Sequence, residues 1–180
     1  MMSTKPESEL KSMILESPSA ERNKGPIYDT ALAPIVFPHL VDDMHGNGNK
    51  INVLELAAGC GVHTTHFASS FLAGNKGFAL EWHPSDPDLA ARSSIDARVQ
   101  LMKFGESVVA SNGWILGKSG GTACGDGIRD KGDAGSSQSG NAGDASTYEK
   151  YDGHFDLALC INMIHIAPWE ATLGLMECAG

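Results

Sequence analysis

The chain has 180 residues, 42% of them hydrophobic, which suits one globular domain of ordinary size. Its formal net charge of −9 argues against a nucleic-acid partner, because phosphate binding needs clustered Lys and Arg. No apolar run reaches the ~18 residues of a membrane span, and no signal or transit peptide is visible. The four cysteines have no CxxC spacing and are typical of reduced thiols. We therefore expect a cytoplasmic protein with no membrane partner.

The N-terminal part of the chain predicts a weakly ordered segment followed by a helix. Residues 1–17 are expected to be weakly ordered, and a helix to begin near Pro18, because proline suits a first helical turn. The expected apolar face of this helix repeats every four residues, at Ile27, Ala31 and Ile35. Pro34 has no N–H to donate, so it should kink the helix.

Strand and helix patterns alternate along the rest of the chain. Short apolar runs bounded by loops are typical of strands in a parallel sheet, and they occur at residues 51–56, 78–82, 108–116 and 155–164. Helices are expected between and after them, over residues 62–72 and 88–104 and from residue 168 onward. This order predicts one α/β domain over residues 18–180, with a parallel sheet flanked by helices.

A tract at residues 117–147 interrupts this alternation. It is rich in Gly, Ser, Ala and Asp and has almost no large apolar side chain. Such a segment buries too little surface to offset the entropy lost on ordering. We therefore expect a disordered insertion inside the domain rather than a boundary between two domains.

The first candidate binding cluster follows the strand at residues 51–56. The next five residues are small, which lets a ligand approach the backbone, and the following helix presents free N–H groups at its N-terminus. Glu55, at the end of the strand, can meet an amine or order the loop. An ordinary tight turn is the alternative to a binding loop. Thr64 stands where a GxGxxG fingerprint has its last glycine, which disfavours a nicotinamide-dependent oxidoreductase.

Two more polar clusters follow later strands, and ligands of such sheets bind at the carboxyl ends of the strands. Asp86 is the preferred carboxylate for the ribose hydroxyls of a nucleoside, and Asp88 is the alternative. Asp86 could also cap the next helix, and both roles can coexist. Asn162 and His165 leave the last strand where a substrate could reach them. His165 can move a proton near neutral pH, although a buried histidine held by a carbonyl is commoner.

A metal site is not expected in this region. Cys60, His63 and His66 have spacings that could bring soft ligands together. Cys60 lies in the loop, however, and no fourth ligand is close in sequence. The sequence therefore predicts no metal ion.

Four runs of this sequence together resemble one family. They are residues 19–27, residues 53–61, the run WHPSDPD at 82–88 and the run CINMIHIAPWE at 160–170. They occur in the order found in the methyltransferase-like 26 family, a poorly characterised branch of the class I methyltransferases. The resemblance covers residues 18–105 and 155–180, and the tract at 117–147 lies outside it.

The resemblance implies a Rossmann-like fold that binds S-adenosylmethionine as a small-molecule methyl donor. Its glycine loop is matched by Glu55, Ala57, Gly59, Cys60 and Gly61, where Ala57 replaces the usual first glycine. Asp86 matches the acid that holds the ribose, and Asn162 matches a position beside the methionine moiety and the methyl group.

The same resemblance leaves the catalytic residue and the methyl acceptor unidentified. Arg22, Asn23 and Lys24 match the family's N-terminal signature and are candidate lid or substrate contacts. Arg22, Asn23 and His165 are the candidate catalytic residues. Methyl transfer needs alignment of donor and acceptor more than a strong base, so no one residue must act as the base.

The sequence departs from the family in two places. The acidic residue that follows the third strand and helps hold adenine is not visible. Class I domains also continue with three more strands, so the resemblance implies an incomplete, C-terminally truncated domain. A non-catalytic binding or regulatory module is therefore the alternative to an active methyltransferase. The oligomeric state is not predicted.

Overall fold

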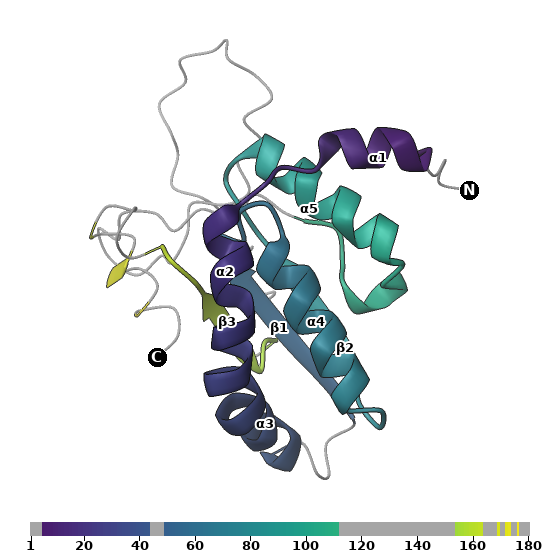
Figure 1. Cartoon of the computed structure of the whole chain (residues 1–180). Coiled ribbons are helices and arrows are strands. Elements are labelled where there is room, and N and C mark those ends of the chain that lie inside the picture. The colour runs from purple at the N-terminus through teal and green to yellow at the C-terminus, as the bar shows by residue number, and fades with distance from the viewer. Residues whose placement is uncertain are drawn as a thin grey trace, which may run out of the picture.

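The computed structural model describes residues 5–43, 49–111 and 154–163, together with Trp169, Thr172, Leu173 and Met176. The elements, in chain order, are α1 (Glu7–Met13), α2 (Pro18–Ile27), the π-helix η1 (Tyr28–Val36), α3 (Phe37–Asp43), β1 (Lys50–Leu56), α4 (Val62–Gly74), β2 (Ala79–Pro84), α5 (Leu89–Met102), the 3₁₀ turn η2 (Gly105–Ser107) and β3 (Leu157–Cys160) (Figure 1). Within these described stretches, no helix is long and apolar enough to cross a bilayer. The expected insertion at 117–147 lies outside the described residues.

A three-stranded parallel sheet with the order β2-β1-β3 forms the centre of the fold. The chain reaches the other edge of β2 through Val108, which forms an isolated parallel bridge with Trp82, and Val109 N–H donates to the Trp82 carbonyl at 3.0 Å. The four segments thus follow the order 3-2-1-4 in which a Rossmann-type sheet places its first strands. The prediction of an α/β fold with a parallel sheet flanked by helices is confirmed. Of the expected strand at 108–116, residues 108–111 are described, and among them Val108 alone lies in a β-bridge.

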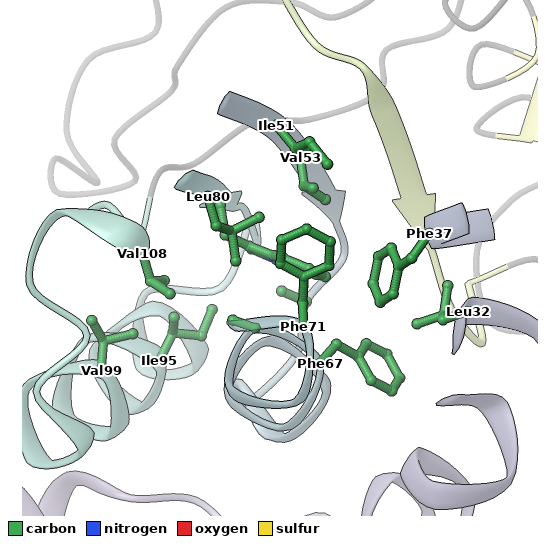
Figure 2. Close-up of a cluster of buried hydrophobic side chains, with 13 residues drawn as sticks. Leu32, Phe37, Ile51, Val53, Phe67, Phe71, Leu80, Ile95, Val99 and Val108 are labelled. Carbon is green, nitrogen blue, oxygen red and sulfur yellow. The ribbon is translucent and has the colours of Figure 1, made fainter. Parts of the chain in front are cut away.

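The hydrophobic core lies between the sheet and the helices α4 and α5. Side chains alternate along a strand, so Ile51 and Val53 of β1 share one face with Leu80 of β2. Figure 2 shows these side chains gathered with Phe71 of α4 and Ile95 of α5. This packing fixes the ends of the strands against the start of α4, where the candidate site lies.

A helical segment built from α2, η1 and α3 covers α4 (Figure 1). It begins with Pro18 in its first turn, as expected. Pro34, at which a kink was expected, lies inside η1. Proline interrupts the i→i−4 hydrogen bonds of an α-helix, and η1 is a π-helix, whose turns are wider. These turns change which residues face inward: Leu32 is buried, whereas Ile35 is 56% exposed. The predicted apolar face is therefore wrong at Ile35.

The N-terminal segment differs from the prediction of weak order. Residues 7–13 form α1, which packs against α5 with Leu10 buried (Figure 1). The backbone that follows α1 is held from both sides, because Leu15 N–H donates to Ser94 Oγ at 3.0 Å and Arg98 donates to the Leu15 carbonyl at 2.9 Å. These partners lie far along the chain, so the local sequence does not reveal them.

Candidate functional site

The loop between β1 and α4 has an unusual backbone. Ala57, Gly59 and Gly61 adopt φ values of +52°, +59° and +83°, a left-handed region that favours glycine. At Gly61 an added methyl group would lie 3.0 Å from the Cα of Ile95, so this glycine lets the start of α4 approach α5 closely. At Gly59 an added methyl group would meet nothing within 4 Å. The backbone at Gly59 therefore has open space beside it.

Asp86, which follows β2, is hydrogen bonded to this loop. The N–H of Gly59 donates to Asp86 Oδ2 at 2.9 Å, and the N–H of Asp88 donates to Asp86 Oδ1 at 2.9 Å. Burial raises the pKa of the Asp86 carboxyl, and these two hydrogen bonds act in the opposite direction. The structure thus brings together the glycine loop and the acidic residue on which the sequence analysis depends.

The carboxylate of Asp88 has a separate task. It accepts a hydrogen bond from Ala90 N–H at 2.9 Å, so Asp88 is the N-cap of α5. Asp86 does not cap the helix in this way, because it binds the N–H of the cap residue itself. Arg92 fixes the same turn by donating from Nη1 to the Asp86 carbonyl at 3.0 Å. Of the two alternatives, Asp86 is the carboxylate that lies at the loop.

Glu55, the next-to-last residue of β1, has only 1% of its surface exposed. Its Oε2 accepts hydrogen bonds from Thr64 Oγ1 at 2.6 Å and Trp82 Nε1 at 2.8 Å, so one carboxylate connects β1, α4 and β2. Burial raises the pKa of Glu55 to about 7, although both hydrogen bonds favour the charged form. The printed side-chain contacts of Glu55 are with α4 and β2, so they hold these two elements to β1.

The partners of Glu55 come from other elements and were not predicted from the sequence. Thr64, noted only for breaking a dinucleotide fingerprint, donates to the buried carboxylate. Ser85 extends the pairing of β1 and β2, because both its N–H and its Oγ donate to the Glu55 carbonyl, at 2.8 and 2.9 Å. The signal available in the sequence was an acidic residue inside an apolar strand, which needs buried donors nearby.

The helix α2 covers the start of α4. Cys60 is buried and packs with Ala20 and Val62, so its thiol lies in an apolar contact. Nearby, His63 Nε2 and Asn23 Oδ1 are 2.7 Å apart. Burial lowers the pKa of His63, so the ring is neutral at pH 7 and its Nε2–H donates to the amide oxygen.

The predicted N-terminal candidates therefore have different surroundings. Asn23 binds His63 beside the loop, whereas Arg22 is exposed. Lys24 pairs with Glu21 at 2.5 Å on the surface of α2. Of these three residues, Asn23 has a printed contact with α4, and that contact is with the side chain of His63.

Asn162 follows β3 at the same edge of the sheet. It is exposed and has a φ of +63°, a conformation that asparagine tolerates better than most residues. The register pairs Leu56 with Cys160, so Asn162 and Ala57 both leave the carboxyl ends of adjacent strands. His165 lies outside the described residues.

The face of the sheet opposite the core carries a group that the sequence analysis missed. Glu81 and His83 of β2 lie next to His154, and each of the three offers one ligand atom within 4.8 Å of the other two. Glu81 Oε1 is 2.7 Å from His83 Nε2, and Lys50 pairs with Glu81 Oε2. The alternation Glu81-Trp82-His83 indicates that the first and third residues share a face, but His154 joins them only through the fold.

A comparison of the chain with models of known protein families finds no match.

Proposed function

We propose that the chain binds S-adenosylmethionine at the carboxyl end of its sheet and transfers the methyl group to an acceptor. The observation that carries this proposal is the hydrogen bond from Gly59 N–H to Asp86 Oδ2, 2.9 Å long. It joins the loop that a nucleoside cofactor would approach to the carboxylate that would hold its ribose. Ligands of parallel α/β sheets bind at this edge.

The chemistry of Asp86 supports this role. A carboxylate has about four acceptor positions, and the backbone N–H groups of Gly59 and Asp88 use two of them. The remaining positions can accept from the two ribose hydroxyls. Because the two N–H groups also fix the orientation of the carboxylate, a ribose would meet an acceptor that is already in place.

The loop supports binding in a second way. The N-terminus of α4 begins at Val62, directly after the left-handed Gly61, and carries unpaired N–H groups with partial positive charge. The open side of Gly59 faces the space in which the cofactor would lie. Asn162, which leaves the adjacent strand, borders this edge where the methionine moiety would extend.

The reaction itself would be an in-line displacement. A nucleophilic atom of the acceptor forms a bond to the sulfonium methyl carbon as the carbon–sulfur bond breaks, and the electron pair of that bond stays on the sulfur of S-adenosylhomocysteine. A proton leaves the acceptor. The chain's contribution is to hold the donor in a fixed orientation, since such a step depends chiefly on alignment.

One observation favours a second candidate, a non-catalytic binding module. Asp86 already has a backbone N–H on each oxygen, as it would in a turn whose role is purely structural. In that case the chain would fold and remain stable without any affinity for the cofactor. Direct measurement of cofactor binding separates the two candidates.

Isothermal titration with S-adenosylmethionine and S-adenosylhomocysteine tests the proposal, with Gly59→Ala and Gly105→Ala as matched variants. Both glycines have a φ near +60° and open space at the added methyl, so both substitutions cost about 1–2 kcal/mol of stability. Only Gly59→Ala places that methyl where the cofactor would lie. We expect it to weaken binding at least about tenfold, an effect of about 1.4 kcal/mol, while Gly105→Ala binds as the unaltered chain does.

Asp86→Asn supplies a second arm of the same experiment. The amide keeps one oxygen acceptor and loses the charge, so we expect weaker binding of both nucleosides. The methyltransferase proposal fails if the unaltered chain gives no binding heat. It also fails if Gly59→Ala and Gly105→Ala bind the cofactor equally well.

A further inference from the structure

Glu81 and His83 lie on the face of the sheet that is turned away from α4 and α5. Their neighbours Leu80 and Trp82 are in the hydrophobic core, and alternate residues of a strand point to opposite faces. His154, from the segment that enters β3, approaches them across that opposite face, with its ring centroid 5.7 Å from that of His83. Two imidazoles and a carboxylate from separate parts of the chain thus meet away from the glycine loop.

The three donors suit a transition-metal ion. One ligand atom from each residue lies within 4.8 Å of the other two. Two histidine nitrogens and one carboxylate oxygen form a common protein ligand set for Zn²⁺, with bonds of about 2.0–2.2 Å and a water completing the tetrahedron. Ligand atoms of such a tetrahedron are about 3.4 Å apart, so the 2.7 Å contact between Glu81 and His83 needs to open by only about 0.7 Å.

The surroundings of the three residues hold them in place. Glu81 and His83 come from one strand that is paired with β1, so their separation is fixed by the sheet. The ring centroid of Phe155 lies 5.0 Å from that of His83 and 4.9 Å from that of His154, so the aromatic ring packs against both imidazoles. The side chain of His83 is 14% exposed and that of Glu81 23%. Lys50 binds Glu81 Oε2 and leaves Oε1 directed at His83.

A metal-binding carboxylate commonly has a hydrogen-bond partner outside the ligand set, and Lys50 is such a partner of Glu81. The simpler interpretation is a surface network in which Glu81 pairs with Lys50 and His83 and no ion binds. His154, whose ring also packs against those of His83 and Phe155, brings a third donor within ligand distance of that pair.

We propose that Glu81, His83 and His154 bind a divalent transition-metal ion, with Zn²⁺ as the best match to their donor atoms. The ion would connect β2 to the segment that enters β3, across the face of β1. Because these segments are far apart in the sequence, its binding energy would add to the stability of the folded chain. This proposal does not depend on the proposed function.

Titration of the metal-free full chain with Zn²⁺, together with the visible absorption of the Co²⁺-loaded chain, tests the site. We expect one ion per chain, an absorption spectrum typical of a tetrahedral site and a rise in the melting temperature on adding Zn²⁺. His83→Gln and His154→Gln should each weaken binding at least tenfold and abolish the rise. His39→Gln, which changes an exposed histidine of α3, is the matched control and should bind as the unaltered chain does.

Circular dichroism of each metal-free variant verifies that it is folded, so that lost binding is not mistaken for lost structure. The proposal is wrong if Zn²⁺ binds no more tightly than a Kd of about 100 µM, or about 5.5 kcal/mol. It is also wrong if His83→Gln and His154→Gln leave the affinity unchanged, because the ion would then bind elsewhere, for instance at Cys60 and His63.

Discussion

The buried carboxyl of Glu55 predicts an unusual dependence of stability on pH. Burial raises its pKa from 4.5 to about 7 in the folded chain, so the folded state holds a proton that the unfolded state releases above pH 4.5. Where the folded state binds more protons, the free energy of unfolding falls as the pH rises. The stability from protonated Glu55 is therefore complete below pH 4.5, is lost as the pH rises to 7, and changes little above that.

The magnitude follows from the two pKa values. Between pH 5 and pH 8, linkage predicts a loss of about 2.5 kcal/mol from this group, most of it between pH 5 and pH 7. The variant Glu55→Gln lacks the titrating proton and keeps an oxygen that can accept from both Thr64 and Trp82. Its stability relative to the unaltered chain should therefore rise by about 2.5 kcal/mol over the same range.

Urea unfolding of both chains at pH 5, 6, 7 and 8 measures this difference. Subtracting the two curves removes the contributions of the other titrating groups, among them the buried His63, whose pKa is lowered. A difference in unfolding free energy that stays constant with pH would refute the reasoning, because it would mean that Glu55 has the same pKa in both states. A difference that falls with pH would mean that its pKa is lowered by folding.

Three further substitutions and one control, Gly74→Ala, test the backbone of the loop and the docking of α1, each by urea unfolding. Ala57→Gly should stabilise the chain by about 0.5–1 kcal/mol, because the strain of a left-handed alanine at φ +52° is larger than the entropy cost of a more flexible unfolded chain. If the substitution destabilises the chain, the alanine is not strained. Gly61→Ala should destabilise by about 2 kcal/mol or more, since the added methyl meets Ile95 at 3.0 Å, whereas Gly74→Ala has open space and should not. Leu10→Ala should cost about 2–3 kcal/mol by releasing α1 from α5, and an unchanged stability would show that α1 is not docked.

The strands and the loop that carries the site could be predicted because their signals are local. The apolar run that becomes β1 is bounded by polar residues and glycines, and the small residues after Leu56 leave few backbone alternatives. The start of α5 near residue 88 was also predicted, although its N-cap is Asp88 and not Asp86, which the sequence offered as a possible cap. In these places propensity, pattern and turn chemistry agree, so the fold adds little new information.

The elements that the sequence did not reveal depend on distant partners. The helix α1 is short, buries Leu10 alone among its residues and is held through Leu15 by Ser94, 79 residues further along. Pro34 lies in the π-helix η1, which has more residues per turn than an α-helix. Ile35 is therefore exposed, although an α-helical period places it on the apolar face. Local composition contains neither of these tertiary constraints.

The candidate site shows the same division. That Gly59 and Asp86 lie near each other could be predicted, since each follows a strand of a parallel sheet. The role of Glu55 could not be decided between contact with an amine and support of the loop, because that depends on the positions of Thr64 and Trp82 in other elements. The group of Glu81, His83 and His154 escaped notice because its third member approaches only once the sheet has formed.

The alternation along β2 makes the two proposals independent of each other. Trp82 points into the core and donates to Glu55 of β1, whereas Glu81 and His83 point to the opposite face. His83→Gln should therefore leave the binding of S-adenosylmethionine unchanged, and Gly59→Ala should leave Zn²⁺ binding unchanged. If either variant alters both affinities, β2 must transmit a shift from one face of the sheet to the other, and titrating the two ligands together would measure that coupling free energy.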